Sequence, residues 1–304
     1  MPQATGINEV CSAIEEAARL AGVPARPDSV RPIVSAFAEG LHEAGVVYSL
    51  STRQDTPAEL DFTLTVPTRS GDPYATALAH GFLTATGHPL DTLLADIQSR
   101  CTISEYLIDG GVAGGFNKIY AHFPQDVQDV AGLAELPSMP PALAQSLGLL
   151  ARHGLSDVAM IGIDYPRRTV NLYFTQLSEQ CRAPATILAL HRELGLPAPG
   201  EAMLAFAARS FRIYTTLSWD SAGIERICYA PPPARGWEPA ALPAPVPERV
   251  AHFVDHAPRA YPGEPIVIAA VKWAPEGEYL NLGPYFQLSP LMRQVISAVH
   301  NGKL

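Results

Sequence analysis

Five pairs of strand-like segments recur along the chain about every 55 residues, and a period this long is typical of one supersecondary unit copied several times. The pairs cover residues 46–66, 102–122, 157–176, 209–231 and 265–287, and helical sequence separates each pair from the next. The repeating order is helix, helix, strand, strand. Because each pair is short and consecutive, we expect five hairpins and ten antiparallel strands.

The strands alternate between polar and apolar residues. From Glu59 to Val66 the odd positions are polar and the even positions apolar, and residues 169–174 and 210–218 follow a similar pattern. Alternation with period two predicts one face packed on apolar material and one face in contact with water or polar groups.

Helical spacing is found between the pairs, at 10–20, 34–44, 74–86, 90–97, 141–150 and 178–194. These helices would cover the apolar face of each hairpin. The polar face would meet solvent in an open sheet, whereas in a closed barrel it lines a lumen and leaves no exposed edge. Ten strands make a barrel too wide for side chains alone to fill. We expect an α+β fold, a closed ten-stranded antiparallel barrel of repeated ααββ units with helices outside; an open sheet is the alternative.

Composition limits the classes of function. The 304 residues are 47% hydrophobic and can bury a large core, and the even repeat predicts a single domain over 1–304. A net charge of −9 argues against nucleic acid and anionic membranes as partners. The chain shows neither a membrane-spanning apolar run nor a signal-peptide profile, so we expect a cytoplasmic monomer. Residues 231–247 are rich in proline and predict a surface loop, and the four cysteines lack metal or disulfide spacing.

Lysine has an unusual distribution. The chain has three lysines against eighteen arginines, yet Lys118 and Lys272 both fall inside predicted strands, where lysine is disfavoured. Lys118 should share a strand face with Tyr120 and His122, and we expect Arg226 to lie opposite Arg212 and Tyr214 on the fourth hairpin. Exposed charges at a sheet edge are the alternative interpretation.

A barrel would turn these cations inward. Buried unpaired charge is costly, and the expected nearby carboxylates are only Glu59 and Asp61. A phosphate or diphosphate ligand would balance the charge. Aromatic residues accompany the cations and would form a wall able to stabilise a carbocation, unless they simply fill the core: Tyr120, Tyr173, Phe211, Tyr214 and Tyr285.

Several segments together resemble the soluble aromatic prenyltransferases of the ABBA type, and nearest a geranyl-transferring member. They are Glu59-Leu60-Asp61-Phe62, Val66-Pro67-Thr68, Gly71-Asp72-Pro73-Tyr74-Ala75-Thr76, Ala85-Thr86-Gly87-His88-Pro89, Gly114-Gly115-Phe116, Pro137-Ser138-Met139-Pro140-Pro141 and Val170-Asn171-Leu172-Tyr173-Phe174. The likeness runs end to end. It implies the prenyltransferase (PT) barrel and an enzyme of secondary metabolism that carries out Friedel–Crafts alkylation. The donor would be dimethylallyl or geranyl diphosphate, and the acceptor a hydroxylated phenol, naphthalene or naphthoquinone.

The resemblance also assigns roles to positions of this chain. Lys118, Asn171, Tyr214 and Arg226 match diphosphate ligands. Asp61 matches the residue that holds Mg²⁺ in a magnesium-dependent member, whereas other members work without metal, so both cases stay open. The prenyl chain and acceptor would contact Tyr48, Leu50, Thr63, Tyr120, Ala159, Thr169, Tyr173, Phe211, Arg212, Ala230, Ile268, Gly283, Tyr285 and Leu291.

Two departures from the family pattern carry hypotheses. Asn281 stands where a relative has a diphosphate-binding lysine, and Lys272 lies on the neighbouring strand. If residue 274 pairs with 279, Lys272 and Asn281 face each other, and Lys272 replaces the missing charge. At the acceptor end, Tyr48, Leu50, Ala159 and Arg212 differ from the relative, so we expect a different acceptor.

Other functions remain compatible with these residues. A barrel could bind an isoprenoid or aromatic ligand without turnover, or hydrolyse or cyclise the diphosphate. The same fold could also form an O-prenyl or reverse-prenyl product. The sequence shows no dedicated base for the ring proton, and it leaves prenyl length, acceptor identity and metal dependence open.

Overall fold

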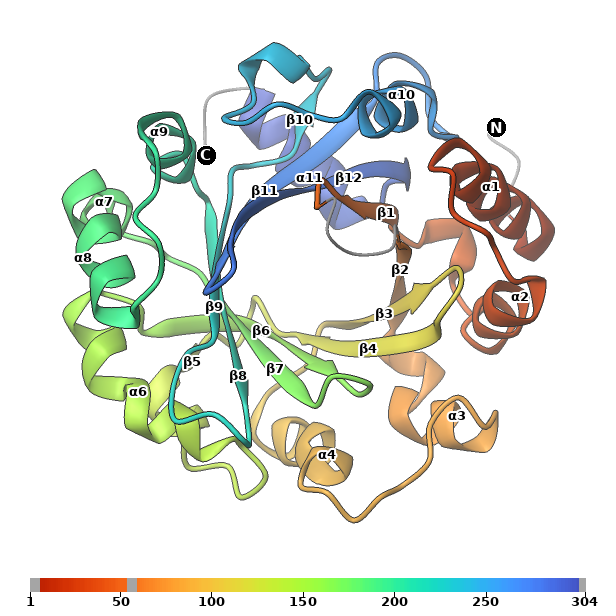
Figure 1. The fold of residues 1–304 in the computed structure, drawn as a ribbon. Helices are drawn as coiled ribbons and strands as arrows, with labels where there is room; N and C mark the ends of the chain where they lie inside the picture. The colour runs from red at the N-terminus through yellow and green to blue at the C-terminus, as the bar shows by residue number, and fades with distance from the viewer. Residues whose placement is uncertain (1–5, 54–58, 301–304) are drawn as a thin grey trace.

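A computed structural model describes residues 6–53 and 59–300, which form a β-barrel surrounded by helices (Figure 1). Ten long antiparallel strands follow one another around the barrel, and pairing of the last hairpin with β9 closes the ring. The predicted closed ten-stranded barrel is therefore confirmed. The strands are β1 (Val46–Ser51), β2 (Leu60–Pro67), β3 (Glu105–Gly111), β4 (Gly115–His122), β6 (Asp157–Asp164), β7 (Thr169–Phe174), β8 (Arg212–Ser218), β9 (Arg226–Ala230), β11 (Ile266–Ala274) and β12 (Gly277–Gln287). Two short strands, β5 (Gln128–Asp129) and β10 (Ala234–Arg235), pair with β6 and β11.

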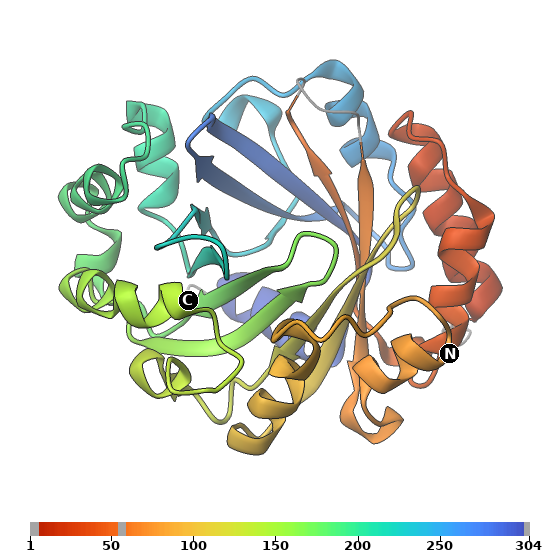
Figure 2. The same ribbon diagram turned by 60° about the horizontal axis from the view of Figure 1, so that its bottom comes forward.

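Most helices lie outside the barrel, as Figures 1 and 2 show. They are α1 (Ile7–Leu20), α2 (Pro27–Ala36), α3 (Pro73–Ala79), α4 (Leu90–Arg100), α5 (Val130–Leu133), α6 (Pro141–Arg152), α7 (Glu179–Arg182), α8 (Pro184–Leu194), α9 (Glu201–Ala207), α10 (Glu248–His256) and α11 (Pro290–His300). No helix within the described ranges is long and apolar enough to cross a membrane.

Proline and glycine residues determine where several helices begin or end, and the bounds predicted for these helices from periodicity were wrong. The helix predicted at 34–44 begins earlier, at Pro27, and ends at Ala36. The one predicted at 74–86 stops at Ala79, because Gly81 takes a left-handed conformation with φ of 70°. The one predicted at 178–194 divides into α7 and α8, because Pro184 disfavours helical geometry at the preceding residue.

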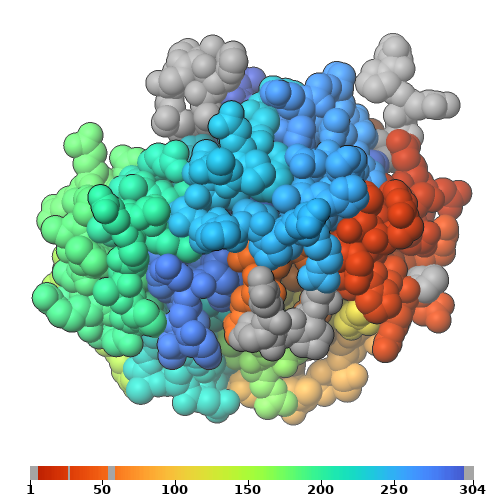
Figure 3. All heavy atoms as spheres, turned by 45° about the horizontal axis from the view of Figure 1, so that its top comes forward, coloured from red at the N-terminus to blue at the C-terminus, as the bar shows by residue number. Residues whose placement is uncertain are grey.

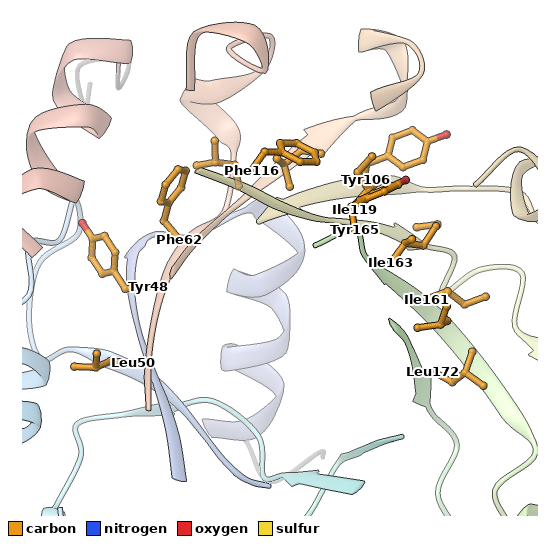
Figure 4. Packing of buried hydrophobic residues seen from close by; sticks show 14 of the residues in the cluster. Tyr48, Leu50, Phe62, Tyr106, Phe116, Ile119, Ile161, Ile163, Tyr165 and Leu172 are labelled. Atoms are coloured by element: carbon orange, nitrogen blue, oxygen red, sulfur yellow. The ribbon is translucent and has the colours of Figure 1, made fainter. Parts of the chain in front are cut away.

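The apolar core lies between the barrel and its helices. On β2, Leu60, Phe62 and Leu64 are fully buried, while the alternate residues face the lumen and are only partly buried. Figure 4 shows the Tyr48 and Phe62 rings on the outer side of their strands. The period-two pattern thus gave the correct face of β2.

The barrel has two different ends. Four hairpin turns and the paired ends of β1 and β2 lie at one end, because every long strand pairs with its sequence neighbour in an antiparallel hairpin. Figure 3 shows the β11–β12 turn (blue) and the β6–β7 turn (light green) reaching the same face, and residues 231–247 on the surface, as predicted. At the other end, residues of α11 border the lumen. We call these the hairpin end and the α11 end.

Candidate active site

The lumen holds a cavity of about 760 Å³. A smaller cavity of about 130 Å³ adjoins it at the α11 end. The two share wall residues Val47, Thr63, Leu107, Met160, Arg212, Ile268 and Tyr285. The predicted site residues that line the larger cavity are Asp61, Thr63, Lys118, Tyr120, Asn171, Tyr173, Arg212, Tyr214, Arg226, Ala230, Ile268, Lys272, Asn281, Gly283 and Tyr285.

A polar cluster near the hairpin end contains the predicted diphosphate ligands. Thr216 holds two of them: its hydroxyl donates to Asn171 Oδ1 at 2.7 Å and accepts from Arg226 Nε and Nη2 at 3.2 and 3.1 Å. The strand register places Arg226 opposite Thr216, not opposite Arg212 and Tyr214 as predicted. Sequence reasoning missed Thr216, although it lies two residues beyond Tyr214 on the same strand face.

Lys272 belongs to the same cluster, but its predicted pairing is wrong. The β11–β12 turn closes between Ala274 and Gly277, so Lys272 lies opposite Tyr279 and Asn281 lies opposite Ala270. Lys272 and Asn281 share a face as diagonal neighbours, and Lys272 Nζ lies 5.9 Å from the centre of the Tyr279 ring. Burial, with the like charges of Arg226 and Lys118, lowers the pKa of Lys272. A two-residue turn, shorter than the one assumed, accounts for the shift in register.

Three carboxylates line the lumen near the hairpin end, where two were expected: Asp109 joins Glu59 and Asp61, and Asp164 lies beside Lys118. Lys118 Nζ lies 3.5 Å from Asp164, and Asp109 accepts hydrogen bonds from Thr63 at 3.2 Å and Tyr120 at 3.4 Å. Burial lowers the pKa of Lys118, but Asp109, Asp164 and Asp61 outweigh it and raise the pKa overall. The signal for Asp109 was its place in the strand facing Lys118, which the sequence analysis did not use.

The cations are therefore unequally compensated. Lys118 lies among carboxylates, whereas Arg226, Lys272 and Arg212 form no ion pair with a carboxylate of the described residues. Arg226 and Lys272 leave a surplus of positive charge beside Asn171 and Tyr214. An anion at this place would relieve that surplus.

Asp61 lies on the carboxylate side of the lumen. Its Oδ1 accepts a hydrogen bond from Asn117 Nδ2 at 3.1 Å. Burial, together with the negative charges of Asp109 and Glu59, raises the pKa of Asp61 to about 7. No group of three metal-ligating side chains occurs among the residues that the structure describes. Asp61 therefore offers one carboxylate, which suits an Mg²⁺ ion that takes its remaining ligands from water and phosphate.

Aromatic rings continue the wall from the hairpin end towards α11. Tyr173 stacks on Tyr214 with ring centres 4.5 Å apart and contacts Tyr120 at 6.0 Å. Burial raises the pKa of Tyr173 and of Tyr285 to about 12, so both phenols stay neutral at pH 7. The wall is uncharged and can contact an apolar chain or a cation.

The smaller cavity contains predicted and unpredicted groups. Phe211 and Leu291 line it, as does Tyr285. Its unpredicted feature is the partly buried pair of His122 and Glu105, with Nδ1 and Oε1 3.0 Å apart. His122 was placed on the correct face, but its partner on the neighbouring strand was not recognised.

Four predicted pocket residues are placed differently by the structure. The Tyr48 ring packs against Phe253 of α10, outside the barrel, although its strand borders the cavity. Leu50 follows on the same outer face and is 1% exposed. Ala159 lies at an irregularity of β6 that brings Met160 to the cavity instead. Thr169 pairs with Asp164 and Ser218 at the hairpin end, outside the wall of either cavity.

The lumen of the closed barrel thus combines a cationic cluster with an aromatic wall, and helices surround the barrel. Residues 5–298 match the family model described as aromatic prenyltransferase Orf2, and the chain belongs to this family. It is 42% identical to flaviolin linalyltransferase of Streptomyces virginiae over 91% of each chain. It is 38% identical to 5,10-dihydrophenazine-1-carboxylate 9-dimethylallyltransferase of Streptomyces anulatus, covering 98% of this chain and 99% of that one. It is 39% identical to the furaquinocin biosynthesis prenyltransferase of a Streptomyces species, covering 95% and 93%.

Solved structures agree on the fold. A 6-dimethylallyl tryptophan synthase aligns with a TM-score of 0.59 over 95% of this chain and 99% of the other, at 12% identity. The prenyltransferase PriB aligns with a TM-score of 0.55 over 93% and 98%, at 13% identity. At these identities the likeness shows the barrel and its helices alone.

Proposed function

We propose that this enzyme transfers a dimethylallyl or geranyl group from its diphosphate to a carbon of an electron-rich, hydroxylated aromatic acceptor. The observation that carries the proposal is the surplus of cations at one end of a closed lumen. Arg226 and Lys272 have no carboxylate partner among the described residues, and they lie beside Asn171, Tyr214 and Asn281. The aromatic wall begins at the same place, at Tyr214.

The reaction would begin with the cationic cluster holding the diphosphate. The bond between the prenyl C1 and the diphosphate oxygen breaks, and its electron pair leaves with the diphosphate. Lys118, Arg226 and Lys272 stabilise that charge, as preorganised donors in a water-poor site do. Asn171 and Tyr214 supply neutral hydrogen-bonding groups.

The aromatic wall would then receive the prenyl cation. Tyr120, Tyr173 and Tyr285 surround the space beyond the cluster and keep water from the cation. A ring carbon of the acceptor donates its electron pair to C1, forming the new carbon–carbon bond. Loss of the ring proton to water restores aromaticity, with no protein base required.

Asp61 is the residue that would hold Mg²⁺ if the donor binds as its magnesium complex. The raised pKa of Asp61 supports this proposal, because a divalent cation would compensate for the burial of the carboxylate and for the repulsion from Asp109 and Glu59, which together raise that pKa. The ion would supply charge neutralisation to the diphosphate. Titration of the donor with and without Mg²⁺, in the wild type and in Asp61→Asn, tests it: the metal should tighten donor binding only in the wild type.

The names of the relatives narrow the acceptor class. One acts on flaviolin and another on a dihydrophenazine carboxylate, both as their names state. We therefore propose a fused-ring aromatic acceptor. Arg212 differs from the residue of the geranyl-transferring relative considered in the sequence analysis, which supports an acceptor distinct from that of this one relative. We expect a cytoplasmic monomer, which size-exclusion chromatography with light scattering would check for the oligomeric state.

A product assay tests the proposal directly. Dimethylallyl and geranyl diphosphate would each be incubated with dihydroxynaphthalenes, flaviolin and phenolic acids, with and without EDTA. A C-prenylated product identified by mass spectrometry and NMR is the expected result. Donor binding without turnover on every acceptor would favour a binding barrel, whereas diphosphate release without transfer would favour a hydrolase or cyclase. An O-prenyl product would show that an acceptor oxygen forms the new bond. A reverse-prenyl product would show that a prenyl carbon other than C1 forms it.

A further inference from the structure

Arg212 is a cation at the α11 end of the lumen. It begins β8, faces the lumen and lines both cavities. Its guanidinium carbon lies 5.1 Å from the centre of the Phe211 ring and 5.9 Å from that of Tyr173. Within the described residues its side chain has no hydrogen bond and no ion pair. Burial lowers its pKa, but an arginine still keeps its proton near neutral pH.

The groups around Arg212 do not supply a counter-ion. Glu105, the carboxylate of the smaller cavity, is bound to His122 at 3.0 Å. Tyr285 stays neutral because burial raises its pKa to about 12. The other neighbours include the apolar side chains Ile268, Leu291 and Met292. A guanidinium enclosed in this way has five N–H donors and no acceptor for them.

The donor diphosphate does not reach Arg212. In the β8–β9 pair, Arg212 lies opposite Ala230, whereas Thr216 lies opposite Arg226. Four residues therefore separate the two positions along the strand, which at about 3.3 Å per residue is roughly 13 Å. The diphosphate belongs to the end that holds Arg226 and Lys272. An anion at Arg212 must come from the other substrate.

We infer that the acceptor is an aromatic anion whose charged oxygen, a carboxylate or an ionised ring hydroxyl, binds the guanidinium of Arg212. This inference rests on the proposed function and adds the charge of the acceptor and its orientation. The anionic group points towards α11, with the ring between Arg212 and the prenyl cation. Guanidinium binds carboxylate through two parallel hydrogen bonds, and Phe211 and Tyr173 hold it in place.

The test uses matched acceptors on the full chain loaded with a non-reactive thiolo analogue of geranyl diphosphate. The acceptors are a dihydroxynaphthoic acid, its methyl ester, the dihydroxynaphthalene without the group, and an acidic hydroxynaphthoquinone. Each is titrated by fluorescence into the wild type, Arg212→Gln and Arg212→Lys. In the wild type an anionic acceptor should bind about 10- to 100-fold more tightly than the ester, the range expected for a charge-assisted pair.

The variants distinguish an effect of the Arg212 charge from an effect on folding. Arg212→Gln should abolish the preference for the anion over the ester, while Arg212→Lys should retain part of that preference. The acid and the quinone distinguish the two sources of charge, and a preference for either supports the inference. Equal binding of all four acceptors, or an anion preference that survives in Arg212→Gln, overturns it. Thermal unfolding confirms that each variant is folded.

Measurement of donor binding distinguishes a failure of the proposed function from a failure of the Arg212 assignment. If the donor analogue fails to bind the wild type, the proposed function itself is wrong. If the donor binds and prenyl transfer proceeds equally to charged and neutral acceptors, only the assignment of Arg212 is wrong.

Discussion

Replacement of Lys272 by methionine tests the cationic cluster most directly. Methionine keeps a similar length and removes the charge. In the free enzyme Lys272 lies over Tyr279 without a carboxylate partner among the described residues, and burial with Arg226 and Lys118 lowers its pKa. Its ammonium group is thus held in an unfavourable place that only an anion improves. We expect the substitution to weaken donor binding and leave folding intact.

The size of the effect follows from the charges. A unit charge 4 Å from another contributes about 4 kcal/mol at an effective dielectric of about 20. Desolvation of Lys272 and repulsion from Arg226 offset part of this. A net loss of about 2–4 kcal/mol corresponds to roughly 30- to 900-fold in donor Kd, at 1.36 kcal/mol per factor of ten. The effect should decrease in the wild type as pH rises through the lowered pKa of Lys272, because the neutral amine loses the attraction.

Calorimetric titration of the thiolo donor analogue measures the change. Arg168→Met is the matched control, since Arg168 is an exposed cation in the β6–β7 turn at the same end and outside the cavity wall. Lys272→Arg should retain most of the affinity. If Lys272→Met binds the donor as tightly as the wild type, then Lys272 does not replace the missing lysine at Asn281, and the reasoning is refuted.

Three further substitutions probe other parts of the lumen. Lys118→Met removes the ammonium group that lies 3.5 Å from Asp164, whose side chain is 3% exposed, and leaves Arg167 Nη1, at 3.4 Å, as its remaining cationic partner; it should lose about 2 kcal/mol of unfolding free energy in urea, and an unchanged midpoint would show that the Lys118–Asp164 pair contributes nothing. The pKa of Asp61 is raised from 3.8 to about 7, so its protonated carboxyl favours the folded state. The contribution of Asp61 to the free energy of unfolding is therefore highest below pH 4 and is lost as the pH rises to 7. Asp61→Asn should therefore gain up to about 4 kcal/mol over the wild type at pH 8 and nothing at pH 4, and equal gains at both pH values would contradict the shift. A Cβ at Gly162 would lie 2.8 Å from the Tyr120 ring, so Gly162→Ala should displace that ring and lower kcat with geranyl diphosphate at least tenfold, whereas wild-type kinetics would show that the ring position is unimportant.

The alternation of polar and apolar residues was the sequence feature that predicted most of the fold. Because side chains alternate strictly along a strand, the even positions of β2 could be assigned to the helix-facing core from the sequence. Helix ends were less predictable. Gly81 and Pro184 terminate helices through backbone geometry, and their effect depends on which residues precede them.

The cations of the site were visible in the sequence because lysine is rare in this chain and unusual in strands. Their partners were not. The pairing of Lys272 with Tyr279, and of Arg226 with Thr216, depends on turn length and register. One residue of error in a turn changes every cross-strand neighbour.

The sequence by itself determined which strand residues are polar and which are apolar, because side chains alternate strictly along a strand, and its resemblance to a known family implied the barrel. Only the tertiary structure decided how charge is distributed within it. Asp109 and Asp164 come from strands on either side of Lys118 and balance it, while Arg226, Lys272 and Arg212 lie where no described carboxylate reaches them. Electrostatic energy depends on distance between groups far apart in the chain, and that distance exists only once the barrel has closed.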